Sequence, residues 1–402
     1  MTPDAGSMPT GISRGLTLLL AITGGVVVAN LYYAQPLLAP ISVALGISPA
    51  AAGLAMTVTQ VGYGLGMLLV VPLGDRFENR ALIAGALSVV ALSLLGAGLA
   101  VNALMFLLCA LALGVSASVA QIIVPFASHL ALPDQRGQVV GNVMSGVLLG
   151  MMLARPISSL VADAFGWRAI FLLSSALVGL FAVGFFRFVP RRQPEAGFRY
   201  RTLFRSMRDL LMTNPVLRRR ASVQFFLFGA FTLFWTTIPM LLAAPPFGIG
   251  LRGIALFALI GVTGAVAAPI VGRAADRGWG RGAAAVALLA SAASFLMCFF
   301  GEDGSMRAMA LLLTAGILLD CGVASSLVLS QRTILALGSE ARSRLNGLFY
   351  TIFYSGGAVG SAVGAWAMVV GGWTLACGIG LAMTLAAIAL HVTAKDAAST
   401  AH

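Results

Sequence analysis

The stretch GRAADRGWGR occupies residues 272–281 and stands between two long apolar segments. A related stretch, VPLGDRFENR, occupies residues 71–80, between two other apolar segments, 201 residues earlier (272 minus 71). Further pairs of short stretches recur in the same order at similar offsets, among them Asp134–Arg136 and Glu340–Arg342. Such in-order repetition indicates the duplication of one unit. The two halves of the chain should therefore fold alike.

The composition indicates that most of this 402-residue chain is surrounded by lipid. Hydrophobic residues make up 59% of it and charged residues 9%, whereas a soluble domain carries about 25% charged residues. A membrane-spanning helix needs about 20 mostly apolar residues, and twelve segments meet that need. The expected spans are 14–38, 49–73, 80–100, 103–130, 138–164, 167–188, 220–242, 250–275, 282–300, 307–331, 343–370 and 373–393.

The basic residues predict how the chain is oriented. Most of the 25 Lys and Arg residues lie in alternate gaps between the apolar segments. Arg168, Arg252 and Arg307 fall in the other gaps, and Arg155 falls inside a span. Cytoplasmic loops carry the excess of Lys and Arg in membrane proteins. We therefore expect a multi-pass protein of the bacterial inner membrane with both termini in the cytoplasm.

The longest polar stretch divides the twelve spans six and six. We expect five parts: a flexible N-terminus (1–13), an N-terminal six-helix bundle (14–189), a basic cytoplasmic linker (190–219), a C-terminal six-helix bundle (220–393) and a cytoplasmic tail (394–402). The arginines of the linker either set the topology alone or also bind anionic lipid headgroups.

Residues 272–281 resemble the loop signature of the major facilitator superfamily, G-x-x-x-D-R-x-x-G-R. The first-half copy departs from it, because Val71 replaces the leading glycine, but it keeps the aspartate and both arginines. Residues 30–36, 166–171 and 356–361 resemble drug and sugar exporters of the same superfamily. The resemblance implies an all-α membrane protein, with twelve transmembrane helices in two pseudo-symmetric bundles that work by alternating access.

The repeated loop is also a candidate conformational latch. A carboxylate at a cytoplasmic helix end can meet the positive N-terminus of a helix from the other half, and the helix that begins near Arg342 is the expected partner. The other interpretation is that Asp-Arg only ends a helix and sets topology. The latch candidates are Asp75, Arg76, Arg80, Asp276, Arg277 and Arg281.

Two charges lie at similar depth inside expected spans. Asp320 is in the span 307–331 and Arg155 is in the span 138–164. A charge at the bilayer centre costs at least about 2.5–3.5 kcal/mol unless it faces water or a partner, so both should face the central cavity. Asp320 could carry a proton with Arg155 as its modulator, the two could form a static pair, or Arg155 could bind a carboxylate or phosphate of the solute.

Polar and aromatic residues of the spans predict the substrate cavity, because polar amides in a membrane need internal partners and should face inward. Each could also serve only to hold helices together. The candidates are Asn30, Tyr33, Gln35, Gln60, Tyr63, Gln121, Gln224, Phe231, Trp235, Tyr350 and Tyr354. Asp163, by contrast, is expected to be an interfacial charge near Arg168.

Together these patterns favour a secondary active transporter that couples proton movement to the efflux of a drug, sugar or metabolite. Proton-coupled uptake is the alternative, because the arginine usual in the fourth helix of related antiporters is missing from residues 109–114 and the fifth-helix antiporter signature is only partly kept. A membrane-embedded enzyme or sensor is a remote alternative. No phosphate-binding G-x-x-x-x-G-K-[ST] motif occurs, which argues against an ATP-driven pump.

The expected partners are a small solute, protons and membrane lipids, with a monomer as the working unit. The net charge of +12 is spread over the gaps between apolar segments, so nucleic-acid binding is not expected. We expect no metal and no cofactor, since the four cysteines and three histidines show no ligand spacing.

Overall fold

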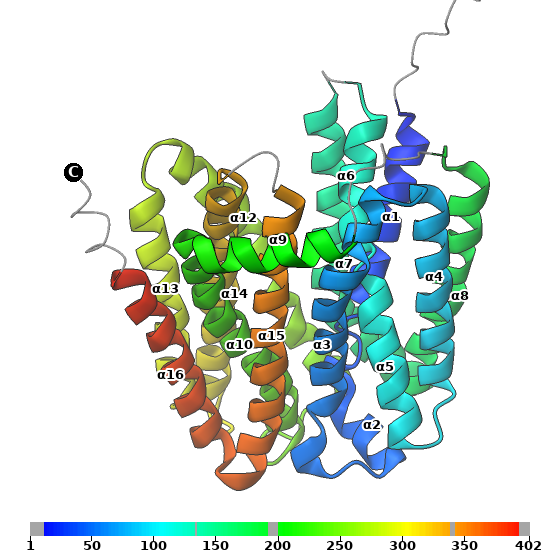
Figure 1. Cartoon of the computed structure of the whole chain (residues 1–402). Coiled ribbons are helices and arrows are strands. Elements are labelled where there is room, and N and C mark those ends of the chain that lie inside the picture. Colours follow the sequence, from blue (N-terminus) through cyan, green and yellow to red (C-terminus); the bar gives the residue numbers. More distant parts are fainter. Residues whose placement is uncertain (1–11, 133–134, 192–199, 338–341, 394–402) are drawn as a thin grey trace, which may run out of the picture.

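The computed structural model describes residues 12–132, 135–191, 200–337 and 342–393. Every regular element in these ranges is a helix. Figure 1 shows two bundles side by side, with the first half of the chain in one and the second half in the other. The helices of the first half are α1 (Arg14–Ala29), η1 (Gln35–Leu37), α2 (Leu38–Leu45), η2 (Pro49–Ala51), α3 (Leu54–Leu69), η3 (Val71–Asp75), α4 (Asn79–Gly98), α5 (Ala103–Ala117), α6 (Ala120–Leu130), α7 (Arg136–Phe165) and α8 (Trp167–Phe188).

The second half follows the same plan. Its helices are α9 (Tyr200–Thr213), α10 (Pro215–Ala243), α11 (Leu251–Ala258), η4 (Leu259–Val262), α12 (Thr263–Asp276), α13 (Gly280–Cys298), α14 (Met306–Leu335), α15 (Arg342–Val370) and α16 (Gly372–Val392). Eleven helical segments of the described chain are long and apolar enough to cross a membrane. The first crossing of the membrane differs from these, because it is divided between two shorter helical segments, α1 and η1–α2. Figure 1 labels α1 and α2 in the upper and lower parts of the first bundle.

The continuous first helix predicted over residues 14–38 is therefore wrong in detail. The helix ends at Ala29 and resumes as η1 at Gln35. Pro36 has no backbone N–H and cannot continue a helical ladder. The carbonyl of Tyr33 instead accepts a hydrogen bond from the Ser158 hydroxyl at 2.6 Å. A neighbouring helix thus satisfies the backbone group that the break leaves unpaired, as membrane-buried irregular backbone requires.

Glycines set two equivalent helix crossings, one in each half. A Cβ on Gly150 of α7 would lie 2.0 Å from the carbonyl oxygen of Gly25 in α1. A Cβ on Gly360 of α15 would lie 1.9 Å from the carbonyl oxygen of Gly229 in α10. Both distances are far below van der Waals contact, so only glycine allows these backbones to approach this closely. The two crossings pair the first helix of each half with its fifth.

Two seams join the bundles. The first is the packing of α3 on α15, where the Thr57 hydroxyl lies 2.9 Å from that of Ser361. The second is the packing of α7 on α11 and η4. Helix α9, which the sequence did not predict, crosses the end of the molecule near the two ends of the described chain (Figure 1). It buries Met207 in an apolar cluster with Leu345 and Phe349.

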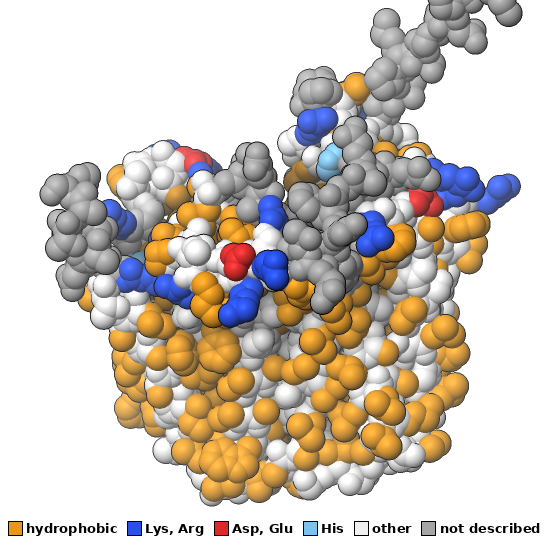
Figure 2. Space-filling model, viewed as in Figure 1, with side chains coloured by type: hydrophobic (Ala, Val, Ile, Leu, Met, Phe, Trp, Pro, Cys, Tyr) orange, Lys and Arg blue, Asp and Glu red, His pale blue; other side chains and the backbone are white. Residues whose placement is uncertain are grey.

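Charges mark the same end of the molecule. Figure 2 shows Lys and Arg side chains around α9 and an almost uncharged, hydrophobic body below it. Some linker arginines hold helix ends together: Arg219 donates to the Leu390 carbonyl at 3.0 Å, and Arg218 donates to the carbonyl of Met212 at the end of α9. The distribution of charge matches a body embedded in lipid with one basic end.

Candidate functional site

Arg155 and Asp320 meet at the interface of the two bundles. Arg155 lies on α7 and is 3% exposed, and Asp320 lies on α14 and is 4% exposed. A Cβ placed on Gly261 would lie 3.2 Å from Oδ2 of Asp320 and 3.7 Å from Nη1 of Arg155. The absent side chain of Gly261 thus leaves the two charges close to each other. They do not form an ion pair within 4.0 Å, although their charges interact.

Trp235 of α10 contacts both charges. Its indole Nε1 donates a hydrogen bond of 2.9 Å to Oδ1 of Asp320. The Arg155 guanidinium stands over its ring, 4.3 Å from the centroid. A cation over an indole face is stabilised by the ring quadrupole, by about 2 kcal/mol or more when desolvated. Trp235 therefore links the acid of the second half to the base of the first.

Further groups of the first half hold Arg155 in place. Its Nε donates to Oε1 of Gln35 at 2.8 Å, and its guanidinium lies 5.1 Å from the centroid of the Tyr32 ring. Arg155 Nη2 and Gln35 Nε2 are buried without a hydrogen-bond partner in the described structure. A buried donor without a partner costs about 1–3 kcal/mol, more when charged. Two unpaired donors beside each other are expected where a site binds a ligand that can accept their hydrogen bonds.

A small cavity lies beside Arg155. It has a volume of about 10 Å³ and is lined by Pro36, Pro239 and Phe257, among others. A water molecule needs a cavity of about 10–15 Å³. This cavity therefore has room for at most one water.

Aromatic residues predicted for the cavity gather along the seam between α3 and α15. The rings of Tyr63 and Tyr354 lie 4.3 Å apart, and those of Tyr350 and Tyr354 lie 6.2 Å apart. Gln121 donates to the Tyr63 hydroxyl at 3.2 Å, and Gln331 donates to that of Tyr350. Phe231 stands 5.2 Å from the Arg155 guanidinium, with its ring stacked on Phe228. The structure brings these predicted residues into one aromatic cluster beside the charges.

Gln60 is the predicted cavity amide whose nitrogen and oxygen are both unpaired in the described structure. It is buried at the same seam. A Cβ on Gly357 of α15 would lie 2.6 Å from its oxygen. Buried polar groups normally find partners, so an unsatisfied amide at the interface of two bundles is a candidate contact for a ligand.

Three predicted cavity residues instead bind within their own half. Asn30 accepts from the Ser174 hydroxyl at 2.6 Å, and Gln224 donates to the Ser326 hydroxyl at 2.7 Å. Tyr33 interacts through its hydroxyl with the same Ser174. These contacts join α1 to α8 and α10 to α14. They are the helix-holding contacts that the sequence had left as the alternative interpretation.

The latch candidates lie at the basic end. Asp276 pairs with Arg332 of its own half, and Arg332 also donates to the Gly272 carbonyl at 2.7 Å. Arg80 lies 3.9 Å from Glu78, and its guanidinium is 5.1 Å from the Phe186 ring centroid. The remaining arginines of the two loops, Arg76, Arg277 and Arg281, are exposed. The side chain of Asp75 lies outside the described atoms, but η3, which it ends, contacts α15.

An ion pair that the sequence did not predict lies at the other end of the molecule. Asp163 of α7 was expected near Arg168, but it binds Arg252 of α11 at 2.5 Å. Arg168 instead donates to the Ala100 carbonyl at 3.0 Å and stands over the Trp167 ring. The Asp163–Arg252 pair joins the two bundles. Separation of 89 residues in the chain hid it from pattern reading.

A sequence match, which agrees with the fold, identifies the family. Residues 20–334 match the model of the Major Facilitator Superfamily. The chain belongs to the major facilitator superfamily. It is 38% identical over 375 residues to the uncharacterized transporter YgaY of Escherichia coli O157:H7, covering 93% of this chain and 94% of the relative. It is 30% identical over 380 residues to a probable transporter of Streptomyces coelicolor, covering 93% and 86%.

A solved structure shares the fold of this superfamily member. The crystal structure of a point mutant of the nucleoside transporter NupG superposes with a TM-score of 0.75 over 94% of this chain and 98% of that one, at 15% identity. The predicted all-α fold with twelve membrane helices in two pseudo-symmetric bundles is confirmed. The chain is thus a multi-pass membrane transporter of small molecules.

Proposed function

We propose that this transporter exchanges protons for a small organic solute by alternating access, with Asp320 as the proton carrier and Arg155 as its modulator. The observation that supports this most is the position of two buried opposite charges on different bundles, joined through Trp235 and not in direct contact. A carboxylate held this way changes its surroundings whenever the bundles move. The change would alter how firmly it holds a proton.

The mechanism follows from the positions of the two halves. When the bundles rock, Asp320 moves with α14 and Arg155 with α7, so their separation changes. Near Arg155, Asp320 is stabilised as a carboxylate and releases its proton; away from Arg155, burial favours the protonated acid. The aromatic cluster and Gln60 would hold the solute beside the charges, a mostly apolar site with a few polar groups.

The direction we propose is efflux from the cytoplasm across a bacterial inner membrane, with both termini inside and a monomer as the unit. The arginines at the α9 end support that orientation through the positive-inside rule. We also propose that the Asp163–Arg252 pair closes the outer entrance and that the repeated loops, with Asp75 near α15, form the inner latch. The first loop and α15 belong to different halves, as a latch requires.

Uptake by proton symport is the second candidate, since the missing fourth-helix arginine weakens the resemblance to antiporters. Inverted membrane vesicles with a respiration-driven pH gradient distinguish the two. A panel of cationic drugs, sugars and amino acids is added while a dye follows the gradient. Efflux by antiport predicts that a transported compound partly collapses the gradient. A symporter predicts no such collapse here but alkalinisation of the medium when the compound is added to right-side-out vesicles.

A further inference from the structure

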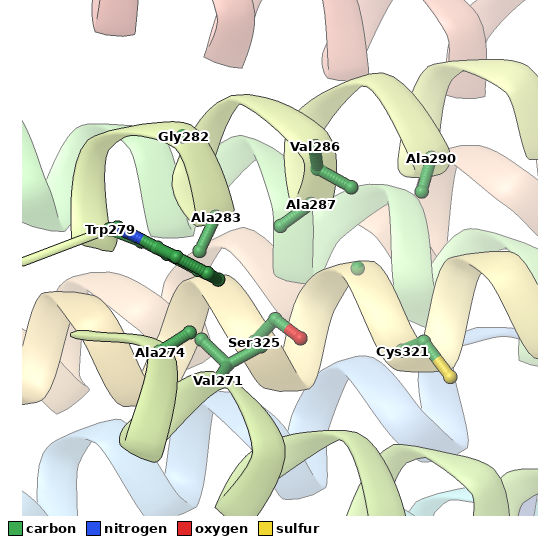
Figure 3. A pocket seen from close by; sticks show the side chains of 11 residues that line it. Val271, Ala274, Trp279, Gly282, Ala283, Val286, Ala287, Ala290, Cys321 and Ser325 are labelled. Carbon is green, nitrogen blue, oxygen red and sulfur yellow. The ribbon is translucent and has the colours of Figure 1, made fainter. Parts of the chain in front are cut away.

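An apolar groove runs along the surface of the second bundle, separate from the charged site. Figure 3 shows α12 and α13 on its two sides, with α14 between them. Its volume is about 480 Å³, within the range of about 300–1,000 Å³ typical of ligand sites. It is lined by Val271 and Ala274 of α12, small residues of α13, and Cys321 and Ser325 of α14.

Small side chains on α13 create the groove. Gly282, Ala283, Ala287 and Ala290 face α12 and α14 across it (Figure 3), and a Cβ on Gly282 would meet nothing within 4 Å. The eight steps from Gly282 to Ala290 cover about 12 Å of helix. One leaflet of a bilayer has about 15 Å of hydrocarbon, half of a core of about 30 Å. The groove is therefore nearly as long as one leaflet is deep.

The groove begins at the basic end of the molecule. Trp279, which is 67% exposed, forms that end, and Cys321 lies at the other (Figure 3). Arg277 and Arg281 flank Trp279 in the chain and are exposed. The one nearby carboxylate of this loop, Asp276, is paired with Arg332. Among the described residues, neither Arg277 nor Arg281 has an ion-pair partner. The apolar groove thus opens between Arg277 and Arg281, whose positive charges are not compensated. We call this end the mouth of the groove.

We propose that this groove binds one anionic phospholipid of the inner leaflet, with an acyl chain between α12 and α13 and the phosphate at Arg277 and Arg281. The groove is part of membrane-spanning helices, so hydrocarbon is the medium that reaches it. Basic residues at the headgroup level attract anionic lipids, and tryptophan prefers that same level. The length and apolar lining of the groove fit an acyl chain, and the positive charge at one end fits an anionic headgroup. The inner end, Cys321, is next to Asp320 in the chain.

The test uses the purified full-length protein, freed of lipid in detergent, and native mass spectrometry. Palmitoyl-oleoyl phosphatidylglycerol or the matching phosphatidylcholine is titrated, and the dissociation constant of the first bound lipid is measured. We expect tighter binding of phosphatidylglycerol. The double variant Arg277→Gln/Arg281→Gln should lose about fivefold per arginine. Gly282→Leu should weaken the binding of both lipids, because its side chain fills the groove.

Matched controls separate this site from general lipid contact. The pair Arg136→Gln/Arg187→Gln removes two exposed charges from the first bundle. Gly85→Leu adds the same side chain at another exposed helical glycine, whose Cβ would also meet nothing within 4 Å. Neither control should change the binding. Ala290→Leu fills the inner part of the groove and replaces Gly282→Leu if that variant does not fold.

Two results would overturn the proposal. Equal binding of the two lipids, or equal losses from both arginine pairs, would show that the charges at the mouth select nothing. Unchanged phosphatidylglycerol binding in a folded groove-filling variant would show that the acyl chain lies elsewhere. A fall in affinity in the groove and Arg277/Arg281 variants alone would support the site.

Discussion

The indole N–H of Trp235 donates a 2.9 Å hydrogen bond to Asp320, while the face of the same ring supports the Arg155 guanidinium. One side chain therefore contacts both buried charges of the bundle interface. Because Trp235 and Asp320 lie in one half and Arg155 in the other, relative motion of the halves must change the second contact and can leave the first unchanged.

Replacement of this tryptophan should impair coupling more than folding. Trp235→Phe keeps an aromatic ring, but it removes the hydrogen-bond donor to Asp320 and weakens the cation–π interaction with Arg155. Hydrogen bonds to charged groups contribute about 1.5–3 kcal/mol, so the transport rate should fall about tenfold or more at normal protein yield. Trp366→Phe, at a 47% exposed position of α15, is the control and should transport like wild type. Unchanged transport in Trp235→Phe would contradict a role in coupling.

A paired substitution separates proton coupling from a merely structural pair. Arg155→Gln leaves Asp320 as a buried charge without a compensating charge nearby, which costs several kcal/mol. We expect low thermal stability and no transport. Arg155→Gln/Asp320→Asn removes both charges and should recover the stability, as measured by thermal unfolding in detergent. Transport should stay absent. A double variant that is stable and moves solute against its gradient would indicate that the pair only holds the bundles together.

The outer ion pair predicts a reversible lock. In a variant without the four native cysteines, a short bis-methanethiosulfonate reagent should cross-link Asp163→Cys to Arg252→Cys and hold α7 against α11. Transport should stop on cross-linking and return when a reductant cleaves the cross-link. Asp163→Asn alone should change the rate only a few-fold, because exposed ion pairs contribute about 0–1 kcal/mol. Full transport by the cross-linked protein would show that this end does not open in the cycle.

The two glycine crossings predict a strict size limit. Gly360→Val puts a side chain where the Gly229 carbonyl oxygen stands 1.9 Å from the ideal Cβ. Since that contact is to backbone, α10 and α15 must separate, and we expect severe loss of folded protein in fluorescence-detected gel filtration. Gly85→Val, at an open position, should fold at a normal yield. Comparable yields for both would contradict the close packing.

Pattern reading predicted those features that depend on local composition. Apolar length predicted the spans, and the repeated loop around Asp276 predicted the two halves. Asp320 and Arg155 stood out because charges inside spans are rare. Their common link, Trp235, was predicted only as one aromatic residue of the cavity, since no spacing relates it to either charge.

Features that depend on tertiary contact could not be predicted. The break before Gln35 depends on a hydroxyl from Ser158, 125 residues away from the Tyr33 carbonyl that it satisfies. Asn30 and Gln224 are as polar as Gln60. Only the contacts of neighbouring helices distinguish these helix-holding amides from Gln60, whose nitrogen and oxygen both lack a partner in the described structure. The predicted partner of Asp163 was wrong for the same reason. Arg168 is close to Asp163 in the chain, but Arg252 binds it in the structure.

The most direct test of the central claim is proton movement in inverted vesicles that contain wild type, Asp320→Asn or Asp209→Asn. The amide introduced by Asp320→Asn keeps an oxygen that can accept from Trp235 but cannot carry a proton, and Asp209 is an exposed carboxylate on α9 that serves as the control. We predict that a transported solute collapses the pH gradient in wild type and Asp209→Asn, and leaves it unchanged in Asp320→Asn. Solute-dependent collapse by Asp320→Asn at the wild-type rate would contradict the account.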